Sequence, residues 1–463
     1  MKTKNNDLLE GKILPTLIRY SIPIILSGLI QVFFNAADMA VLGAFDKTPD
    51  SSAVGAIGAT GAIIGLLVNS MIGFSTGTNV LLARVVGAKD DERAQKIIGS
   101  SLVLSVMVGV TMLAVGIVSA PWFLDITSCP ENSYSGAIIY MNIYFAACPA
   151  ILVYNFASAI IRVSGDSRSP FIYILISGVA NVVLNVILCF IMEEKVAAVA
   201  IATLVSNVVG ATLAVIHLAR IKEGPCRINI KKLQFSWREM GNIILLGFPA
   251  AFTSALYSIS NVQIQGAINS FGSSATAGNS ASAQVESFIG TIVNAIATSA
   301  MVFVGQNVGA SKRDRVKQSI RWCLVMAVVV AVVLGYGALA IGRPLLRIFV
   351  PNDSLAVEIG RVRLACLLSI YFVMATDSVL SATIKSFGYP TFPMMNSMVT
   401  VILFRTIWMN FIYPNMTFVG DPVKDVFNVF VCYMFSWTMS LLVQTVLFAV
   451  IYGRYKKGIV KKV

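Results

Sequence analysis

The chain has 463 residues, of which 57% are hydrophobic and 12% are charged, and its mean hydropathy is +0.79. Because soluble domains carry about 25% charged residues, this composition excludes an ordinary soluble protein and indicates a polytopic membrane protein. The net charge of +13 would suit nucleic-acid binding, but the basic residues cluster between apolar stretches and mostly on one side, which argues against a nucleic-acid surface.

Twelve apolar stretches are each long enough to span a bilayer as a helix. In chain order they cover residues 17–44, 54–82, 97–120, 135–161, 170–192, 196–218, 241–269, 280–305, 319–342, 361–384, 391–413 and 425–452. The first stretch is too long for a signal-peptide core and lacks a clear cleavage site, so we expect it to remain in the mature protein. The predicted fold class is an all-α membrane protein.

The distribution of Lys and Arg predicts the topology. Most of the 35 basic residues fall in segments that face the cytoplasm if the N-terminus does. The positive-inside rule therefore places both termini in the cytoplasm. We expect a multi-pass monomer in the inner (cytoplasmic) membrane, in contact with the lipid bilayer. Of the seven cysteines, only Cys129 and Cys226 fall in predicted loops, on opposite sides of the membrane, so no disulfide framework or metal cluster is expected.

The second half of the chain repeats motifs of the first half at a near-constant offset. Pro23 and Asn35 recur as Pro249 and Asn261. The other matches are Val86-Gly87-Ala88 with Val308-Gly309-Ala310, and Arg162-x-x-Gly165-x-x-x-x-Pro170 with Lys385-x-x-Gly388-x-x-x-x-Pro393. A duplicated six-helix unit follows, and because six is even the repeats are parallel, with a pseudo-two-fold axis along the membrane normal. The expected domains are a lobe at 1–221, a cytoplasmic linker at 222–239 and a lobe at 240–463.

Two such bundles enclose a cleft, and their symmetry supports alternating access. The chain contains no G-x-x-x-x-G-K-[ST] loop to hold a nucleotide phosphate, so the energy for transport is expected to come from an ion gradient. The sequence therefore predicts a secondary transporter rather than an enzyme, with no cofactor.

Ionisable residues well inside the predicted spans are few. They are the acids Asp38, Glu286 and Asp377 and the base Arg405. Arg405 shares the second lobe with two of the acids, so a buried ion pair would explain one of them. Asp38 has no base in its own lobe, and its burial must be relieved by a proton, a cation or water. Asp38 is the leading coupling candidate, and Asp377 and Arg405 are secondary candidates.

Neutral polar residues accompany Asp38. Asn181 and Asn185 are spaced four apart, which puts both amides on one face of a helix, and Thr203 lies in the next span. Carboxylate, amide and hydroxyl oxygens are ligands that a hard cation accepts. The alternative is plain interhelical hydrogen bonding, which is common in membranes.

These motifs together resemble the multidrug and toxic compound extrusion (MATE) family, particularly its bacterial multidrug-efflux branch. The resemblance covers nearly the whole chain. It is carried by the duplication, Pro23 and Asp38, Arg162-x-x-Gly165-Asp166-x-x-x-Pro170, Asn181-x-x-x-Asn185 and Gln306-Asn307-x-Gly309-Ala310.

The resemblance implies an antiporter that exports organic cations in exchange for H+ or Na+. It also implies a first-lobe ion site at Asp38, Asn181, Asn185 and Thr203, where Na+ is one candidate ligand. Two positions depart from the family pattern. Some members carry an acid where this chain has Asn185, and certain relatives carry a carboxylate where it has Tyr257.

For the substrate we expect a cleft with aromatic faces and negative charge, which attract lipophilic cations. Its candidate residues are Gln31, Phe34 and Asn35 from the first lobe and Tyr257, Asn261 and Glu286 from the second. The alternative function is a flippase of a lipid-linked sugar or peptidoglycan precursor, which should present several Lys or Arg to a polyanionic headgroup. A receptor or membrane scaffold, the third reading, gives no reason for isolated buried acids.

Overall fold

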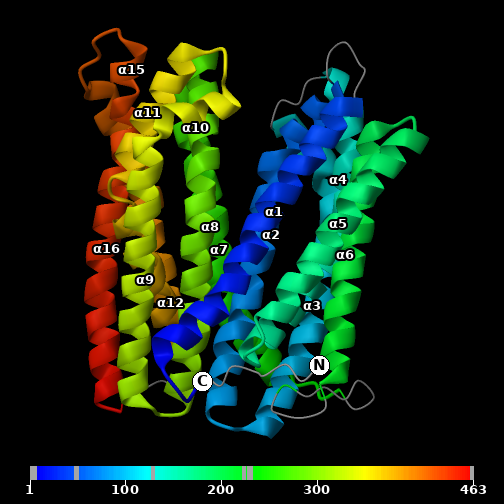
Figure 1. Ribbon diagram of the computed structural model, residues 1–463, viewed down its shortest axis with the longest axis vertical. Coiled ribbons are helices and arrows are strands. Elements are labelled where there is room, and N and C mark those ends of the chain that lie inside the picture. The colour runs from blue at the N-terminus through cyan, green and yellow to red at the C-terminus, as the bar shows by residue number, and fades with distance from the viewer. Residues whose placement is uncertain (1–7, 46–51, 127–130, 222–225, 227–232, 459–463) are drawn as a thin grey trace. The chain divides into compact units, whose positions relative to one another are not determined.

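The structure is a computed structural model that describes residues 8–45, 52–126, 131–221, 226 and 233–458. Cys129, and residues 222–225 and 227–232 of the predicted linker, lie outside the described residues. Figure 1 shows the described chain as a set of long helices. No strand occurs in this part of the chain, and the predicted all-α class is confirmed.

Long helices account for most of the described residues. They are α1 (Ile13–Phe45), α2 (Ser52–Gly87), α3 (Asp91–Ile126), α4 (Glu131–Val163), α5 (Arg168–Ile191), α6 (Lys195–Arg220), α7 (Trp237–Asn269), α8 (Ser273–Gly309), α9 (Arg313–Ala340) and α16 (Phe427–Lys456). Shorter helices are α10 (Gly342–Phe349), α11 (Ser354–Leu368), α12 (Tyr371–Ser386), α13 (Thr391–Ser397), α14 (Phe404–Ile407) and α15 (Pro422–Asp425). Two π-helical segments, Met398–Leu403 and Trp408–Ile412, flank α14, and a 3₁₀ turn follows at Tyr413–Asn415.

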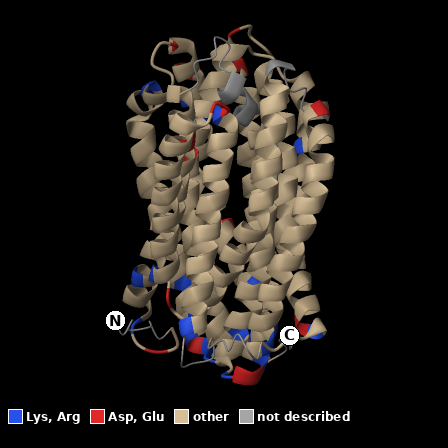
Figure 2. Ribbon diagram, turned by 90° about the vertical axis from the view of Figure 1, so that its right-hand side faces the viewer, with Lys and Arg blue, Asp and Glu red and all other residues tan. Residues whose placement is uncertain are grey.

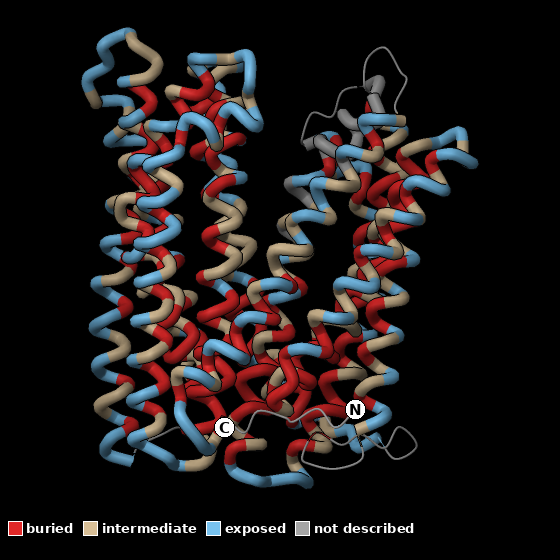
Figure 3. The backbone as a smooth tube through the Cα atoms, viewed as in Figure 1, coloured by how far each residue is buried: buried red, intermediate tan, exposed pale blue. Residues whose placement is uncertain are grey.

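Among the described residues, ten helical stretches are long and apolar enough to cross a membrane. An eleventh is the pair α11 and α12, which is bent by 48° at its break. Charged side chains concentrate at the ends of the long helices (Figure 2), and along each helix buried positions alternate with exposed ones (Figure 3). This pattern is expected of helices that turn one face to each other and another face to lipid.

The chain forms two compact units. The first unit comprises residues 1–11 and 18–251, and the second comprises 12–17 and 252–463. The division falls inside α7, two residues after its proline, Pro249. A missing backbone donor at a proline makes a helix easier to bend, so the division coincides with a natural weak point of this helix.

The repeat found in the sequence reappears in the backbone of each unit. The turn after α2 has Lys89 at φ 59°, and the turn after α8 has Ser311 at φ 56°. The turn after α4 has Gly165 at φ 90°, and the turn after α12 has Gly388 at φ 84°. Because positive φ is uncommon for residues other than glycine, the matched pair at Lys89 and Ser311 strongly supports a duplicated structure.

Small residues let α2 approach the first half of α7. A Cβ at Gly73 would overlap the backbone of Ala251, and one at Gly77 would overlap the carbonyl oxygen of Ile243. Contacts of this kind bring two helix backbones together and are typical of membrane helices. The other small pair of α2, Gly61 and Gly65, has open space at the Cβ positions.

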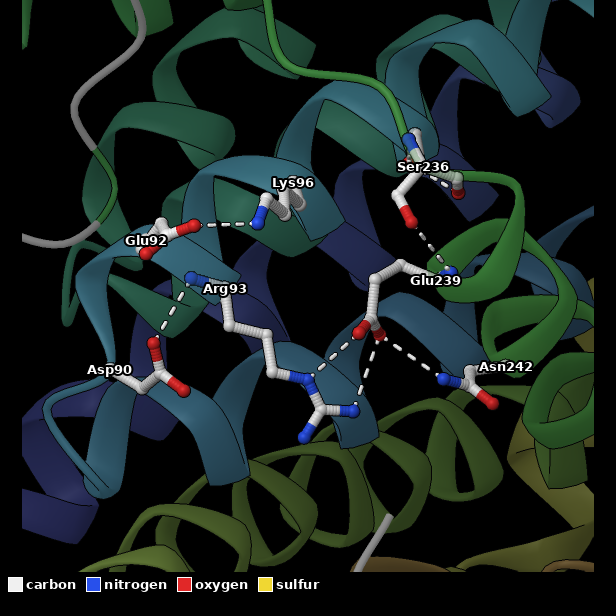
Figure 4. A network of polar contacts seen from close by, with 8 residues as sticks. Asp90, Glu92, Arg93, Lys96, Ser236, Glu239 and Asn242 are labelled. Atoms are coloured by element: carbon white, nitrogen blue, oxygen red, sulfur yellow. Dashed lines mark hydrogen bonds and ion pairs between the residues drawn. The ribbon is translucent and has the colours of Figure 1, made fainter.

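A polar network fastens the start of α7 to α3 within the first unit (Figure 4). The Arg93 guanidinium donates to both oxygens of the buried Glu239 carboxylate, with Nε at 2.9 Å and Nη2 at 3.3 Å. Asn242 donates to the same carboxylate at 3.2 Å, and the Ser100 hydroxyl is hydrogen-bonded to the backbone of Ser236. Residues 237–239, which the sequence assigned to the linker, thus form the ordered first turn of α7.

Candidate functional site

Four polar side chains of the first unit form a continuous hydrogen-bonded cluster. Asn185 Nδ2 donates to Asp38 Oδ1 at 2.5 Å and to Asn181 Oδ1 at 3.3 Å. Asn181 Nδ2 donates to Thr203 Oγ1 at 3.4 Å. The cluster joins α1, α5 and α6, and the two asparagines reach it because residues four apart lie on one helix face. The structure brings together all four residues named from the sequence as an ion site; their role stays a prediction.

Asp38 has an amide partner and no ion pair within the described residues. The ion pairs of the first unit involve other residues: Arg93 with Glu239, Lys96 with Glu92, and His217 with Asp166. Asn185 is fully buried, and its Oδ1 atom accepts no hydrogen bond from any described residue. A carboxylate can accept a proton, and together with the unused oxygen of the amide that binds it, it can help to coordinate a small hard cation.

Two tyrosines of α4 lie in the electrostatic neighbourhood of Asp38, and the sequence reasoning did not name them. Tyr140 and Tyr144 both lie close enough to Asp38 to feel its charge. Their rings are 6.1 Å apart between centroids, as expected for neighbours one helical turn apart. Their spacing of four residues puts both rings on one face of α4, but nothing in the sequence indicates that this face lies near Asp38.

The first-unit substrate candidates lie on α1 in different surroundings. Gln31 and Asn35 are exposed. Phe34 is half-buried, and its ring occupies the position that a Cβ of Gly178 would take. Since Gly178 precedes Asn181 by one helical turn on α5, Phe34 packs beside the Asp38 cluster, whereas Gln31 and Asn35 form no hydrogen bond to the cluster among the described residues.

In the second unit Glu286 is part of an ion pair. Its Oε2 atom lies 2.6 Å from Arg363 Nη2, and the two side chains are 19% and 7% exposed. Arg363 Nη1 also donates to the Ser282 hydroxyl at 3.3 Å. The sequence analysis offered Arg405 as the base that could pair with Glu286, and the partner is Arg363 instead. Arg363 was not named because it lies at the edge of the predicted span 361–384, whereas the structure buries it within α11, which packs against α8.

Arg405 is not paired with an acid among the described residues, so the predicted ion pair for this residue is wrong. Its Nε donates to Ser436 Oγ at 3.1 Å, and its Nη1 lies 3.5 Å from Ser260 Oγ and from Asn261 Oδ1. Its guanidinium carbon lies 4.3 Å from the centre of the Tyr433 ring. Arg405 is 1% exposed, so its charge is held by neutral dipoles and one aromatic face.

The remaining candidates of the second unit surround this region without forming one cluster. Asp377 accepts a hydrogen bond from Ser440 at 3.1 Å. Tyr257 lies near Asp377, Arg405 and Ser397. Among the described residues, no three His, Cys, Asp or Glu side chains gather as ligands for a metal ion. In the second unit, the Glu286–Arg363 pair, Arg405 and Asp377 thus have different hydrogen-bond partners.

The chain belongs to the MatE family, whose model matches residues 23–187 and 249–411, one stretch in each half. A probable multidrug resistance protein YoeA of Bacillus subtilis is 25% identical over 94% of this chain and 92% of its own length. A probable multidrug resistance protein NorM of Thermotoga maritima is 23% identical over 85% of this chain and 82% of its own length.

The fold of solved MATE proteins matches as well. A crystal structure of MATE in complex with MaL6 superposes with a TM-score of 0.88 and 19% identity, over 98% of this chain and 100% of the other. This likeness confirms the predicted fold class of twelve helices in two lobes. The chain is accordingly a multi-pass membrane protein of the MATE multidrug-efflux transporter family, and not an enzyme.

Proposed function

We propose that this protein is a secondary antiporter that exports organic cations in exchange for H+ or Na+ by alternating access. One observation carries the proposal: Asp38 lies in the first unit among neutral amides and a hydroxyl, with no ion-pair partner among the described residues. A carboxylate within a membrane span is costly unless it binds a proton or a cation. The multidrug resistance proteins among its relatives support export of drug-like molecules.

The coupling ion acts at the Asp38 cluster in this proposal. An ion moving inward gains about 2.3 kcal/mol per 100 mV of membrane potential. That energy biases inward-facing against outward-facing states only if the ion binds the two states with different affinity. Asp38 lies on α1, which also carries Pro23, and binding at Asp38 would alter the hydrogen bond that ties α1 to α5. The ion thereby changes which arrangement of α1 is favoured.

The flippase alternative finds less support in the side chains. A polyanionic headgroup would require several uncompensated bases, and Arg363 is already neutralised by Glu286. Arg405 alone does not make a polyanion site. We also propose, from the distribution of Lys and Arg, that the protein lies in the cytoplasmic membrane with both termini inside; the expected monomer stays a prediction.

Transport by the purified protein in proteoliposomes tests the proposal. The probe is tetraphenylphosphonium, and a proton gradient and a Na+ gradient are imposed separately. We expect one gradient to drive uphill movement of the probe by the wild type, and Asp38→Asn to abolish it while inserting and folding normally, because Asn keeps the shape and loses the charge. The matched control is Asp377→Asn, a second intramembrane carboxylate.

Two results would contradict the proposal. If Asp38→Asn accumulates the probe against its gradient at the wild-type rate, the ion is not coupled at this cluster. If neither gradient drives uphill transport by the wild type while the potential is clamped, the protein is not a cation antiporter of this kind.

A further inference from the structure

Arg405 is the largest fully buried side chain among the described residues. A guanidinium cannot lose its proton in a protein, so its charge persists wherever it is placed. Its hydrogen-bond acceptors are the side chains of Ser436, Ser260 and Asn261, all of them neutral. A buried charge surrounded only by neutral groups lacks the compensation that ordinarily makes burial tolerable.

The acids of the second unit that could compensate Arg405 are engaged elsewhere. Glu286 pairs with Arg363 at 2.6 Å, and Asp377 accepts from Ser440 at 3.1 Å. Neither carboxylate lies within ion-pair distance of Arg405 in the described part of the chain. The group of side chains around Arg405, here called the Arg405 cage, consists of Ser260, Asn261, Arg405, Tyr433 and Ser436 and is short of one negative charge.

The hydrogen bonds of the Arg405 cage are weakest at Asn261. Asn261 is exposed, and its Oδ1 atom accepts two long hydrogen bonds, from Arg405 Nη1 at 3.5 Å and from the Tyr433 hydroxyl at 3.4 Å. The hydrogen bonds of Arg405 to Ser436, Ser260 and Asn261 come from its Nε and Nη1 atoms. An incoming acceptor that displaced the Asn261 side chain would therefore meet two guanidinium nitrogens, the fork that binds carboxylate or phosphate through two parallel bonds.

The backbone around Arg405 is also unusual. π-Helical segments, Met398–Leu403 and Trp408–Ile412, flank the single turn of α14 that carries it. Such segments are rare and frequently occur at functional sites. A row of aromatic rings leads from Tyr433 to Trp437, with ring centroids 5.9 Å apart, and on to Tyr371 at 5.8 Å. Trp437 and Tyr371 are buried, whereas Tyr433 is partly exposed, so a planar apolar group attached to an acid would pack against the Tyr433 ring.

We propose that the second unit binds an acidic group, a carboxylate or a phosphate, at the Arg405 cage, and that the preferred ligands are aromatic organic anions or zwitterions. The acidic group takes the place of the Asn261 oxygen on the guanidinium, and the aromatic part lies against Tyr433. The same chemistry is offered by the phosphate of an anionic lipid headgroup. The site is separate from the Asp38 cluster and belongs wholly to the second unit.

Equilibrium dialysis with the purified full-length protein tests this binding in the absence of any gradient. The probes are naphthoate, naphthyl phosphate and the neutral naphthamide. We expect the two anions to bind at least about tenfold more tightly than the amide, a difference equivalent to about 1.4 kcal/mol. Nanodiscs of phosphatidylcholine and of phosphatidylglycerol separate the two sources: competition by phosphatidylglycerol assigns the site to a lipid headgroup, and unchanged binding assigns it to a free acid.

Two variants test whether the anions bind at Arg405. Arg405→Gln removes the charge, and Ser436→Asp supplies a carboxylate from within the cage, next to the guanidinium. Both should abolish the preference for the anions, whereas Ser436→Asn, of similar size and neutral, should retain it. Since Arg405→Gln tests the site only if it folds, Ser436→Asp provides the independent test, because an internal partner should stabilise the fold while blocking the site.

Two control variants should leave anion binding unchanged. Arg343→Gln removes an exposed charge whose side chain is 58% exposed and should leave anion binding unchanged. Asp38→Asn should also leave it unchanged, so that failure of the antiporter proposal does not affect this one. Equal binding of naphthoate and naphthamide by the wild type, or an anion preference that survives in Ser436→Asp, would overturn the proposal.

Discussion

The interiors of the two units hold their charges in different ways. In the first unit Asp38 is surrounded by Asn185, Asn181 and Thr203, and it has no base to neutralise it among the described residues. In the second unit Glu286 is neutralised by Arg363, whereas Arg405 has only neutral acceptors. The two copies of the duplicated scaffold therefore differ: the first holds an acid without an ion-pair partner, and the second holds a base with only neutral acceptors in addition to an acid, Asp377, whose hydrogen-bond donor is the Ser440 hydroxyl.

The difference teaches that position within the repeat does not determine function. Asn35 and Asn261 correspond in the repeat, yet Asn261 accepts a hydrogen bond from Arg405, whereas the Asn35 side chain is hydrogen-bonded to no other side chain in the described part of the molecule. The role of each position depends on what the neighbouring helices present to it. The predictions below test the contrast by removing or restoring partners in each unit.

The largest effect is expected from breaking the Glu286–Arg363 pair. Arg363→Met leaves Glu286 without its partner among side chains that are mostly buried, and removal of one partner of a buried pair costs about 3 to 5 kcal/mol. The double variant Glu286→Gln with Arg363→Met should recover most of this loss. Thermal melts of the purified proteins measure it, and additive losses in the double variant would show that the pair is not coupled.

A smaller effect is expected from removing the amide that faces Asp38. Asn185→Leu deletes a hydrogen bond to a carboxylate, an interaction worth about 1.5 to 3 kcal/mol. Ion-driven transport should fall with it. Thr203→Val should have a smaller effect. Thr203 accepts only a long hydrogen bond from Asn181, at 3.4 Å, and donates its own proton to the Val199 carbonyl of the same helix. A loss from Thr203→Val as large as that from Asn185→Leu would contradict this ranking of the two contacts.

The smallest effect is expected at Asp353, a carboxylate outside the membrane spans, and it gives a reference for the effects of the buried charges. Asp353 caps α11 by accepting from the Ala356 N–H, and that hydrogen bond lowers the pKa of the Asp353 carboxyl. Because the pKa is lower in the folded than in the unfolded state, ionised Asp353 stabilises the fold at pH values above the unfolded-state pKa of about 3.9. This stabilisation is lost as the pH falls through the pKa of the folded state.

The measurement is the difference in melting temperature between wild type and Asp353→Ala as a function of pH. This difference should be present at neutral pH and shrink under acidic conditions. Asp353→Asn serves as the control, because Asn can cap a helix without titrating. A difference that grows as the pH falls would reverse the expected sign.

Only part of the Asp38 cluster was predictable from local geometry; that Asp38 of α1 and Thr203 of α6 meet the two asparagines was implied by the resemblance to the MATE family. Asn181 and Asn185 share a helix face by their spacing alone, and each belongs to an uninterrupted apolar stretch. The repeat was predictable for a related reason, since turns such as those at Gly165 and Gly388 depend on short motifs that survive in the sequence.

The partner of Glu286 was not predictable in the same way. A search for one long apolar stretch set the span at 361–384 and left Arg363 at its edge. The structure divides this region into α11 and α12, bent by 48°, so that Arg363 lies well inside a separate helix. Hydropathy measures how apolar a window is, and it carries no information on where a helix breaks or which neighbour a buried base will meet. The π-helical segments beside Arg405 escaped prediction for the same reason.

The course of α7 has a consequence for how the protein is made. Residues 237–251 of this helix belong to the first unit, where Glu239 binds Arg93 and the backbone near Ala251 fills the space above Gly73. A nascent chain of which only the first six helices have been synthesised therefore lacks a segment that packs against α2 and α3 in the first unit. The first bundle can therefore complete its packing only after the start of α7 has been synthesised. If the gene is split at the linker, the N-terminal fragment should be degraded by quality-control proteases unless the C-terminal fragment is produced in the same cell.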